Sequence, residues 1–149
     1  MKTANIMRFA PANVKNEGDR REWAVCGFEG IKRVKHDAKA YNVASDIEVG
    51  DRKISVKASK FSLMSGSLCE GYTTFEDIWK LYETKCHSNE WAYITKDYTA
   101  YFMNKAEFKD FVFQFCITEK ESEKNGGAVK IRCRTETQKM INWLQSRVS

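Results

Sequence analysis

The spacing of apolar residues changes repeatedly along this chain, from the alternation typical of β-strands to the three- and four-residue spacing typical of helices. Alternation marks residues 42–49 and 53–59, and the Gly50-Asp51-Arg52 segment between them indicates the turn of a β-hairpin. Residues 91–95 and 98–103 are expected to form a second antiparallel pair. The mixture of periods predicts an α/β (α+β) domain, with a sheet flanked by helices.

Four segments carry the signals of helices. Residues 75–82 place Phe75, Ile78, Trp79 and Tyr82 on one face, which is the stripe of an amphipathic helix. Each helix is expected to begin at a capping residue followed three positions later by Glu or Gln. These pairs are Asp19 with Glu22, Thr73 with Glu76, Asn104 with Glu107, and Thr135 with Gln138.

The length of 149 residues suits one domain with a real core. The single proline, Pro11, and the scarcity of glycine argue against a long linker after the first fifteen or so residues. Residues 1–17 are expected to form an irregular arm, with a short strand around 5–9.

The sequence lacks the signals of a membrane or secreted protein. No apolar run approaches the roughly 20 residues that span a bilayer, and the first eleven residues are a poor secretion signal. The five cysteines have no CxxC spacing, so zinc binding lacks its usual ligand pattern. We therefore expect mostly buried, reduced thiols in a cytoplasmic protein.

The net charge of +5, with a pI near 8.9, is mildly basic. Such a balance favours a polyanionic partner without establishing one, because many proteins of this charge bind no nucleic acid. The basic residues Lys130, Arg132 and Arg134 alternate along a predicted strand at 129–133. They are suited to gripping a phosphate backbone, and equally to forming the polar side of an edge strand and helix.

Three residues of the predicted hairpin carry the clearest chemical signal. Asp46 lies on its first strand, and Ser55 and Lys57 lie two positions apart on its second, so both point to one face. A carboxylate can hold a hard divalent cation that polarises a phosphate, and an ammonium can orient the attacking water. The alternative is that these are solvated polar positions of an ordinary hairpin.

This stretch resembles the PD-(D/E)xK phosphodiesterase superfamily, which has the restriction-endonuclease-like fold. Asp46 matches the first acid of that signature, and Val56-Lys57 matches the end of the second motif. The resemblance covers roughly residues 19–95, followed by a strand-helix extension over 96–149. It implies an α-β-β-β-α-β core with a mixed sheet.

The sequence departs from the signature at two positions. Ser45 replaces the proline, and Ser55 stands at the second acidic position. Some members with Ser-Val-Lys recruit a glutamate about a dozen residues after the lysine, which here is Glu70. Glu76 and Glu22, the latter on the first predicted helix, are the other candidates.

The resemblance implies a nuclease that cleaves DNA phosphodiesters with Mg²⁺ held by Asp46 and Glu70, or Glu22 in its place, and with Lys57 at the attacking water. Expected nucleic-acid contacts are Lys60, Lys130, Arg132 and Arg134. The alternative from another class is an inactive accessory factor of a phage or mobile element, which binds DNA or blocks a host defence complex. A plain interaction domain is the third reading.

Overall fold

The computed structural model describes residues 1–32, 45–64, 66–120 and 128–149. The first residues of the predicted strand 42–49 lie outside these ranges. Within them the chain forms a mixed sheet, a smaller second sheet and four α-helices, which confirms the α+β class. No helix in the described ranges combines the length and the apolar character needed to span a bilayer.

The larger sheet has five strands in the order β1-β6-β5-β3-β2. The strands are β1 (Lys2–Asn5), β2 (Ile47–Val49), β3 (Arg52–Ala58), β5 (Glu90–Ile94) and β6 (Thr99–Met103). Neighbouring strands are antiparallel except β3 and β5, which are parallel. A parallel pair needs a crossover connection, and here that connection contains α2 (Phe75–Lys85).

Both predicted antiparallel pairs are confirmed. Val49 is paired with Arg52, so the β2–β3 turn consists of Gly50 and Asp51, and Gly50 takes the left-handed conformation with φ of 55°. The β5–β6 pair encloses Lys96 and Asp97, as expected.

The second sheet has three antiparallel strands in the order β4-β8-β7. These are β4 (Phe61–Ser62), β7 (Cys116–Lys120) and β8 (Val129–Cys133). The strand at 129–133 is confirmed, but β8 lies in the centre of its sheet, so the alternative that its basic residues line an edge strand does not hold. Strand β7 was not predicted, because it follows a helix directly without a turn residue between them.

The helices are α1 (Glu17–Glu29), α2, α3 (Lys105–Phe115) and α4 (Gln138–Ser146). The capping box of Asn104 and Glu107 is confirmed. The other three predicted caps are wrong by one to three residues. The capping side chains are Asn16, Thr74 and Thr137, which accept the backbone N–H groups of Asp19, Asp77 and Met140.

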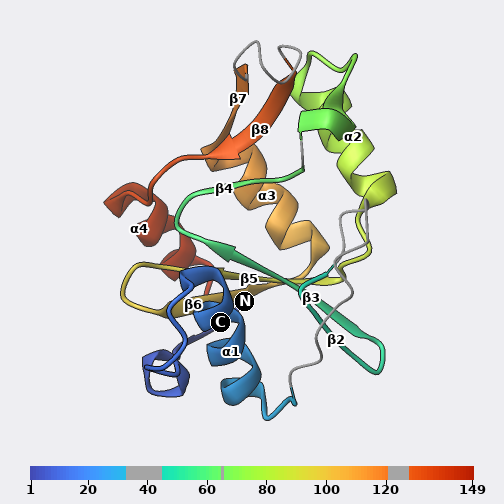
Figure 1. Ribbon diagram of the computed structural model, residues 1–149. Coiled ribbons are helices and arrows are strands. Elements are labelled where there is room, and N and C mark those ends of the chain that lie inside the picture. The colour runs from blue at the N-terminus through green and yellow to red at the C-terminus, as the bar shows by residue number, and fades with distance from the viewer. Residues whose placement is uncertain (33–44, 65, 121–127) are drawn as a thin grey trace.

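Helices cover both faces of the larger sheet, as Figure 1 shows, with α1 on one side and α2, α3 and the second sheet on the other. Each side has its own apolar cluster. The cluster beneath α1 includes Ala24, Val25, Ile47 and Ile54. The larger cluster contains Trp91 and much of α2 and α3, and it joins the two sheets.

Aromatic side chains organise the larger cluster. The rings of Trp91 and Phe108 stack with centroids 4.8 Å apart and planes inclined by 5°. Tyr93 lies two residues further along β5, and the centroid of its ring is 4.9 Å from that of Phe111. Strand β5 therefore carries two aromatic anchors, each packed against α3.

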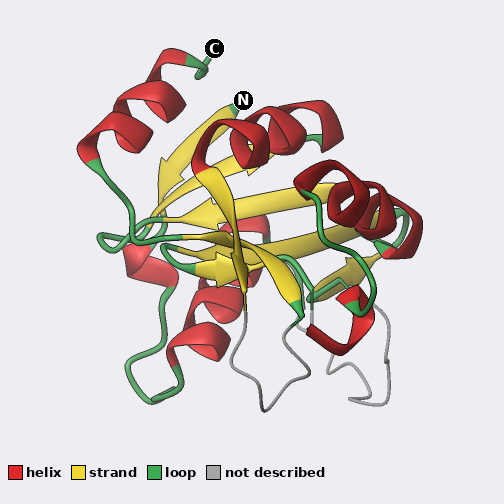
Figure 2. Cartoon of the chain, turned by 90° about the horizontal axis from the view of Figure 1, so that it is seen from above, coloured by secondary structure: helices red, strands yellow, loops and turns green. Residues whose placement is uncertain are grey.

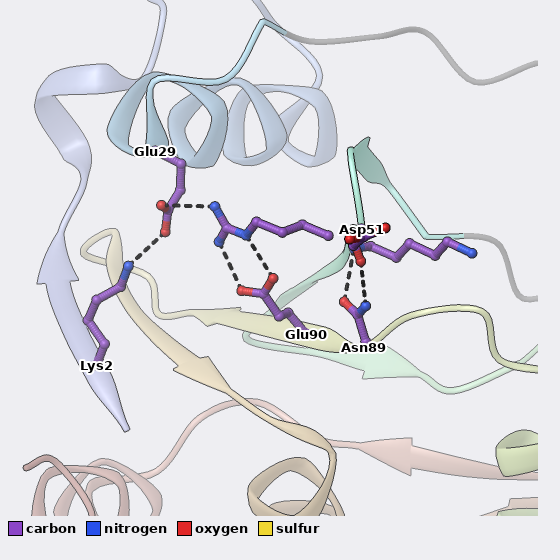
Figure 3. A network of polar contacts seen from close by, with 7 residues as sticks. Lys2, Glu29, Asp51, Asn89 and Glu90 are labelled. Atoms are coloured by element: carbon purple, nitrogen blue, oxygen red, sulfur yellow. Dashed lines mark hydrogen bonds and ion pairs between the residues drawn. The ribbon is translucent and has the colours of Figure 1, made fainter.

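A polar network ties β1, α1, β3 and β5 together (Figure 3). Arg52 donates two hydrogen bonds to the Glu90 carboxylate, at 2.8 and 2.9 Å, and a third to Glu29 at 3.3 Å. Lys2 binds the other oxygen of Glu29 at 2.9 Å. Burial raises the pKa of Glu29, but the hydrogen bonds from Lys2 and Arg52 outweigh it, so the pKa of Glu29 lies below its ordinary value.

The ends of the chain take part in the larger sheet and its surroundings. Strand β1 pairs with β6, whereas residues 1–17 were expected to be an irregular arm with a strand at 5–9. The boundary expected at residue 95 falls inside the β5–β6 hairpin, so residues beyond it belong to the same sheet. The two termini lie close together in Figures 1 and 2. The Met1 ammonium donates to the Arg147 carbonyl at 3.0 Å.

Phe108→Ala is expected to lower the free energy of unfolding by about 3–5 kcal/mol, because it leaves a cavity beside Trp91. Phe113→Ala is the matched control on the same helix, since Phe113 is 45% exposed, and it is expected to cost about 1 kcal/mol or less. Urea denaturation measures both values. Equal losses for the two variants would contradict the assignment of the core.

Candidate functional site

The structure brings Asp46, Ser55 and Lys57 to one face of the larger sheet. Ile47 and Ile54 are paired and lie in the α1 cluster, so the neighbouring positions Asp46 and Ser55 point to the opposite face. Lys57, two residues beyond Ser55, points the same way.

Strand β5 fixes what surrounds these side chains. Ser55 is paired with Trp91 and Lys57 with Tyr93, both of which belong to the α2–α3 cluster. The candidate site therefore lies at the edge of the aromatic core. Ser55 is only 2% exposed, so its hydroxyl is inside the protein.

Asp46 is held at the start of the hairpin by two hydrogen bonds. Its backbone N–H donates to the Ile54 carbonyl at 2.9 Å, and its Oδ2 accepts the Val56 N–H at 2.7 Å. The side chain thus extends the β2–β3 ladder by one bond beyond the end of β2. This bond fixes the carboxylate and engages one of its two oxygens.

Lys57 lies between the two sheets. Its Nζ is 5.8 Å from the centre of the Phe61 ring on β4. Burial lowers the pKa of Lys57 below its ordinary value of 10.5, and the negative charge of Asp46 opposes that shift. An amine whose pKa is lowered in this way is neutral in a larger fraction of molecules at a given pH than an exposed lysine, and only the neutral amine can act as a general base.

Three further side chains form the rest of this environment, and sequence analysis did not identify them. Trp91 Nε1–H donates to the Tyr82 hydroxyl at 2.8 Å. Burial raises the pKa of Tyr82, and its interaction with Cys86 raises it further. Tyr82 and Cys86 are four residues apart at the end of α2, which is the one signal in the sequence that relates them.

The glutamates proposed to complete a metal site are not brought to Asp46 by any contact in the described ranges. Glu70 is exposed in the turn after the short helix η2 (Gly66–Cys69), which packs against β8. Glu76 is exposed in the first turn of α2. Glu22 belongs to α1, which covers the opposite face of the sheet. In the parts of the chain that the structure describes, no group of three or more His, Cys, Asp or Glu side chains is arranged to hold a metal ion.

The basic residues predicted to contact nucleic acid differ in whether a neighbouring carboxylate already pairs with them. Arg132 is paired with Glu119 at 2.8 Å and also donates to Ser62. Lys130 lies opposite Glu119 in the β7–β8 register. Lys60 and Arg134 are exposed and flank the paired residues Phe61 and Cys133, so they are adjacent across β4 and β8.

A separate cavity of about 460 Å³ lies between the β5–β6 turn and the start of α4. Its lining includes Lys96, Asp97, Tyr101 and Glu136, but none of Asp46, Ser55 and Lys57. The Lys96 N–H donates to Glu136 at 2.9 Å, which joins the turn to the residue before the Thr137 cap. We assign this cavity no part in the candidate site.

No known protein family, curated protein or solved structure matches this chain. The chemistry of the site therefore rests on its own residues.

The pKa of Lys57, followed by NMR titration of its side-chain Cε resonance, is expected to lie below 10.5. Asp46→Asn should lower it further, because the substitution removes a negative charge that favours the ammonium. Asp51→Asn, at the exposed hairpin turn, is the matched control and should leave it unchanged. A wild-type pKa at or above 10.5, or no response to Asp46→Asn, would contradict this electrostatic arrangement.

The same shift fixes the sign of a stability effect. Between the lowered folded-state pKa and the unfolded value near 10.5, the unfolded chain binds more protons than the folded one. The contribution of Lys57 to the free energy of unfolding therefore rises with pH across that window. Subtracting the pH profile of Lys57→Met from that of the wild type isolates this contribution from those of the buried tyrosines.

Proposed function

We propose that this chain is a nucleic-acid phosphodiesterase of the restriction-endonuclease-like kind, with Asp46 and Lys57 as its reacting pair. The observation that carries the proposal is their position on one sheet face, where the charge of Asp46 acts on the Lys57 amine. A carboxylate beside an amine of lowered pKa is suited to activating water next to a phosphate.

The order of elements supports the same proposal. Helix α1 precedes the β2–β3 hairpin, and α2 then leads to β5, which is parallel to β3. The superfamily core has an α-β-β-β-α-β order, and the described elements supply five of its six members in sequence. The short strand β4 lies between β3 and α2 but pairs in the second sheet.

Lys57 has the clearest role in the proposed reaction. In its neutral form the Nζ accepts a proton from the attacking water, and in its charged form it offsets the negative charge that develops on the phosphate. Trp91, which is paired with Ser55, donates a hydrogen bond to Tyr82, and both of these side chains are buried. Asp46 orients the amine through its charge and is itself held by the Val56 N–H.

A magnesium ion would bind at this site together with the substrate, whose phosphate oxygens would be among its ligands. Protein Mg²⁺ sites commonly use one or two carboxylates, with waters and substrate phosphates as the other ligands. Asp46 would supply its Oδ1, since Oδ2 accepts the Val56 N–H. A bound ion would polarise the phosphate and lower the pKa of a water ligand.

The proposed substrate is DNA or another nucleic acid. Lys60 follows β3 by two residues, and Arg134 is adjacent to it across the β4–β8 pair. Both are exposed on a chain of net charge +5, which suits them to contact a phosphate backbone near Lys57. Glu119 neutralises Arg132, so this residue is a weaker candidate.

A second candidate is a binding protein that does not hydrolyse its ligand. The burial of Ser55 at the second motif position, together with the lack of a three-ligand cluster in the described ranges, favours it. In this reading Lys60 and Arg134 still bind nucleic acid while Asp46 and Lys57 stabilise the hairpin. The accessory role against a host defence complex belongs to this candidate, and Ser55 in place of the second acid and the small size of the chain suit it.

Cleavage of supercoiled, branched and single-stranded DNA with Mg²⁺ or Mn²⁺ tests the first proposal. Asp46→Asn and Lys57→Met are each expected to reduce the rate by about 100-fold or more, because each removes one member of the reacting pair. Asp51→Asn on the same hairpin is the matched control and should cleave at the wild-type rate.

The outcomes separate the two candidates. Equal cleavage by Asp46→Asn and the wild type would overturn the phosphodiesterase proposal. DNA binding without cleavage in either metal, weakened by Lys60→Ala and Arg134→Ala and by added salt, would establish the binding protein instead.

A further inference from the structure

Two buried cysteines are opposite each other in the second sheet. Cys116 is the first residue of β7 and Cys133 the last of β8, and the antiparallel register pairs them directly. Opposed residues of antiparallel strands have Cα atoms about 4.5–5.5 Å apart. Disulfide-bonded cysteines have Cα atoms roughly 4.4–6.8 Å apart, so the backbone already meets that requirement.

The side chains of this pair contact each other as well. The exposed fractions of Cys116 and Cys133 are 8% and 0%, their thiols interact electrostatically, and Cys133 Sγ also donates to the Arg134 carbonyl at 3.5 Å. All five cysteines of the chain lie in the described ranges, where none forms a disulfide, and Cys86 is the only one of them that is not buried. Oxidation of Cys116 and Cys133 is therefore expected to give a disulfide within one chain and not a disulfide between two chains.

We propose that Cys116 and Cys133 are an oxidation site, a dithiol that a peroxide converts to an intramolecular disulfide. The thiolate of one cysteine attacks a peroxide oxygen, which breaks the O–O bond and gives a sulfenic acid and hydroxide. The sulfur of the second cysteine then attacks the sulfenic sulfur, forms the S–S bond and displaces the hydroxyl group. Two thiols and one hydrogen peroxide yield one disulfide and two water molecules.

The surroundings set when this reaction occurs. The interaction with Cys133 and burial both raise the pKa of Cys116, so this thiol stays protonated at neutral pH and reacts slowly. Hydrogen peroxide is small enough to reach a nearly enclosed thiol during local opening, whereas a bulky disulfide is not. The site therefore responds to strong or sustained peroxide exposure.

The bond would join two parts of the fold. Cys116 directly follows α3, which carries Phe108 and Phe111 of the aromatic cluster, and Cys133 belongs to the central strand of the second sheet. A disulfide there constrains the unfolded chain and fastens α3 to β8. The proposal does not depend on the phosphodiesterase proposal, since Asp46 and Lys57 take no part in it.

The test treats the full chain with excess hydrogen peroxide, then unfolds it, alkylates the remaining thiols and maps peptides without reduction. The expected product is a monomer lighter by two hydrogen atoms in which the peptides of Cys116 and Cys133 are joined. Its Tm should rise by roughly 5–10 °C and return to the starting value after reduction. Mapping uses the wild-type chain, so its result does not depend on whether a variant folds.

Variants provide the controls. Cys86→Ser should still form the bond, whereas Cys116→Ser should not and should show no rise in Tm on oxidation. The proposal is overturned if both thiols stay open to alkylation, if they gain oxygen without becoming joined, or if either is joined to a different cysteine.

Discussion

The parallel pairing of β3 with β5 is the constraint on which the rest of the molecule depends. Parallel strands need a crossover, and α2 supplies it, so the α2 face of the sheet becomes the one on which Trp91 and Tyr93 are buried. The same register places Ser55 beside Trp91 and Lys57 beside Tyr93. Two polar residues of β3 are thereby brought to an aromatic core.

Placing Lys57 beside an aromatic core has an energetic cost, and the residues that offset this cost define the candidate site. Burying a lysine disfavours its charged form, as the lowered pKa of Lys57 reflects. Asp46 offsets part of this cost, and the Val56 N–H fixes Asp46 where it can do so. A core built for stability alone would favour an apolar residue at Lys57, and a half-buried amine whose pKa responds to a nearby carboxylate is the feature on which the proposed chemical role rests.

Sequence analysis predicted much of the fold and only part of the site. Local signals located the strand pairs and the Asn104 cap, because alternation and capping act over a few residues. Strand β7 was missed because no turn precedes it, and the other caps were displaced because several capping residues compete near each helix start.

The convergence of Asp46 and Lys57 followed from hairpin geometry. Tyr82, Cys86 and Trp91 could not be found, because a long-range crossover brings them there.

A double-mutant cycle on the free energy of unfolding tests the central claim, that Asp46 and Lys57 form one interacting pair, most directly. Asp46→Asn, Lys57→Met and the double variant are compared with the wild type by urea denaturation at neutral pH. We predict a coupling of about 0.5–3 kcal/mol, since removing the carboxylate costs less once the amine is gone. Additivity within about 0.3 kcal/mol would contradict the claim and leave the two residues as independent features of a hairpin.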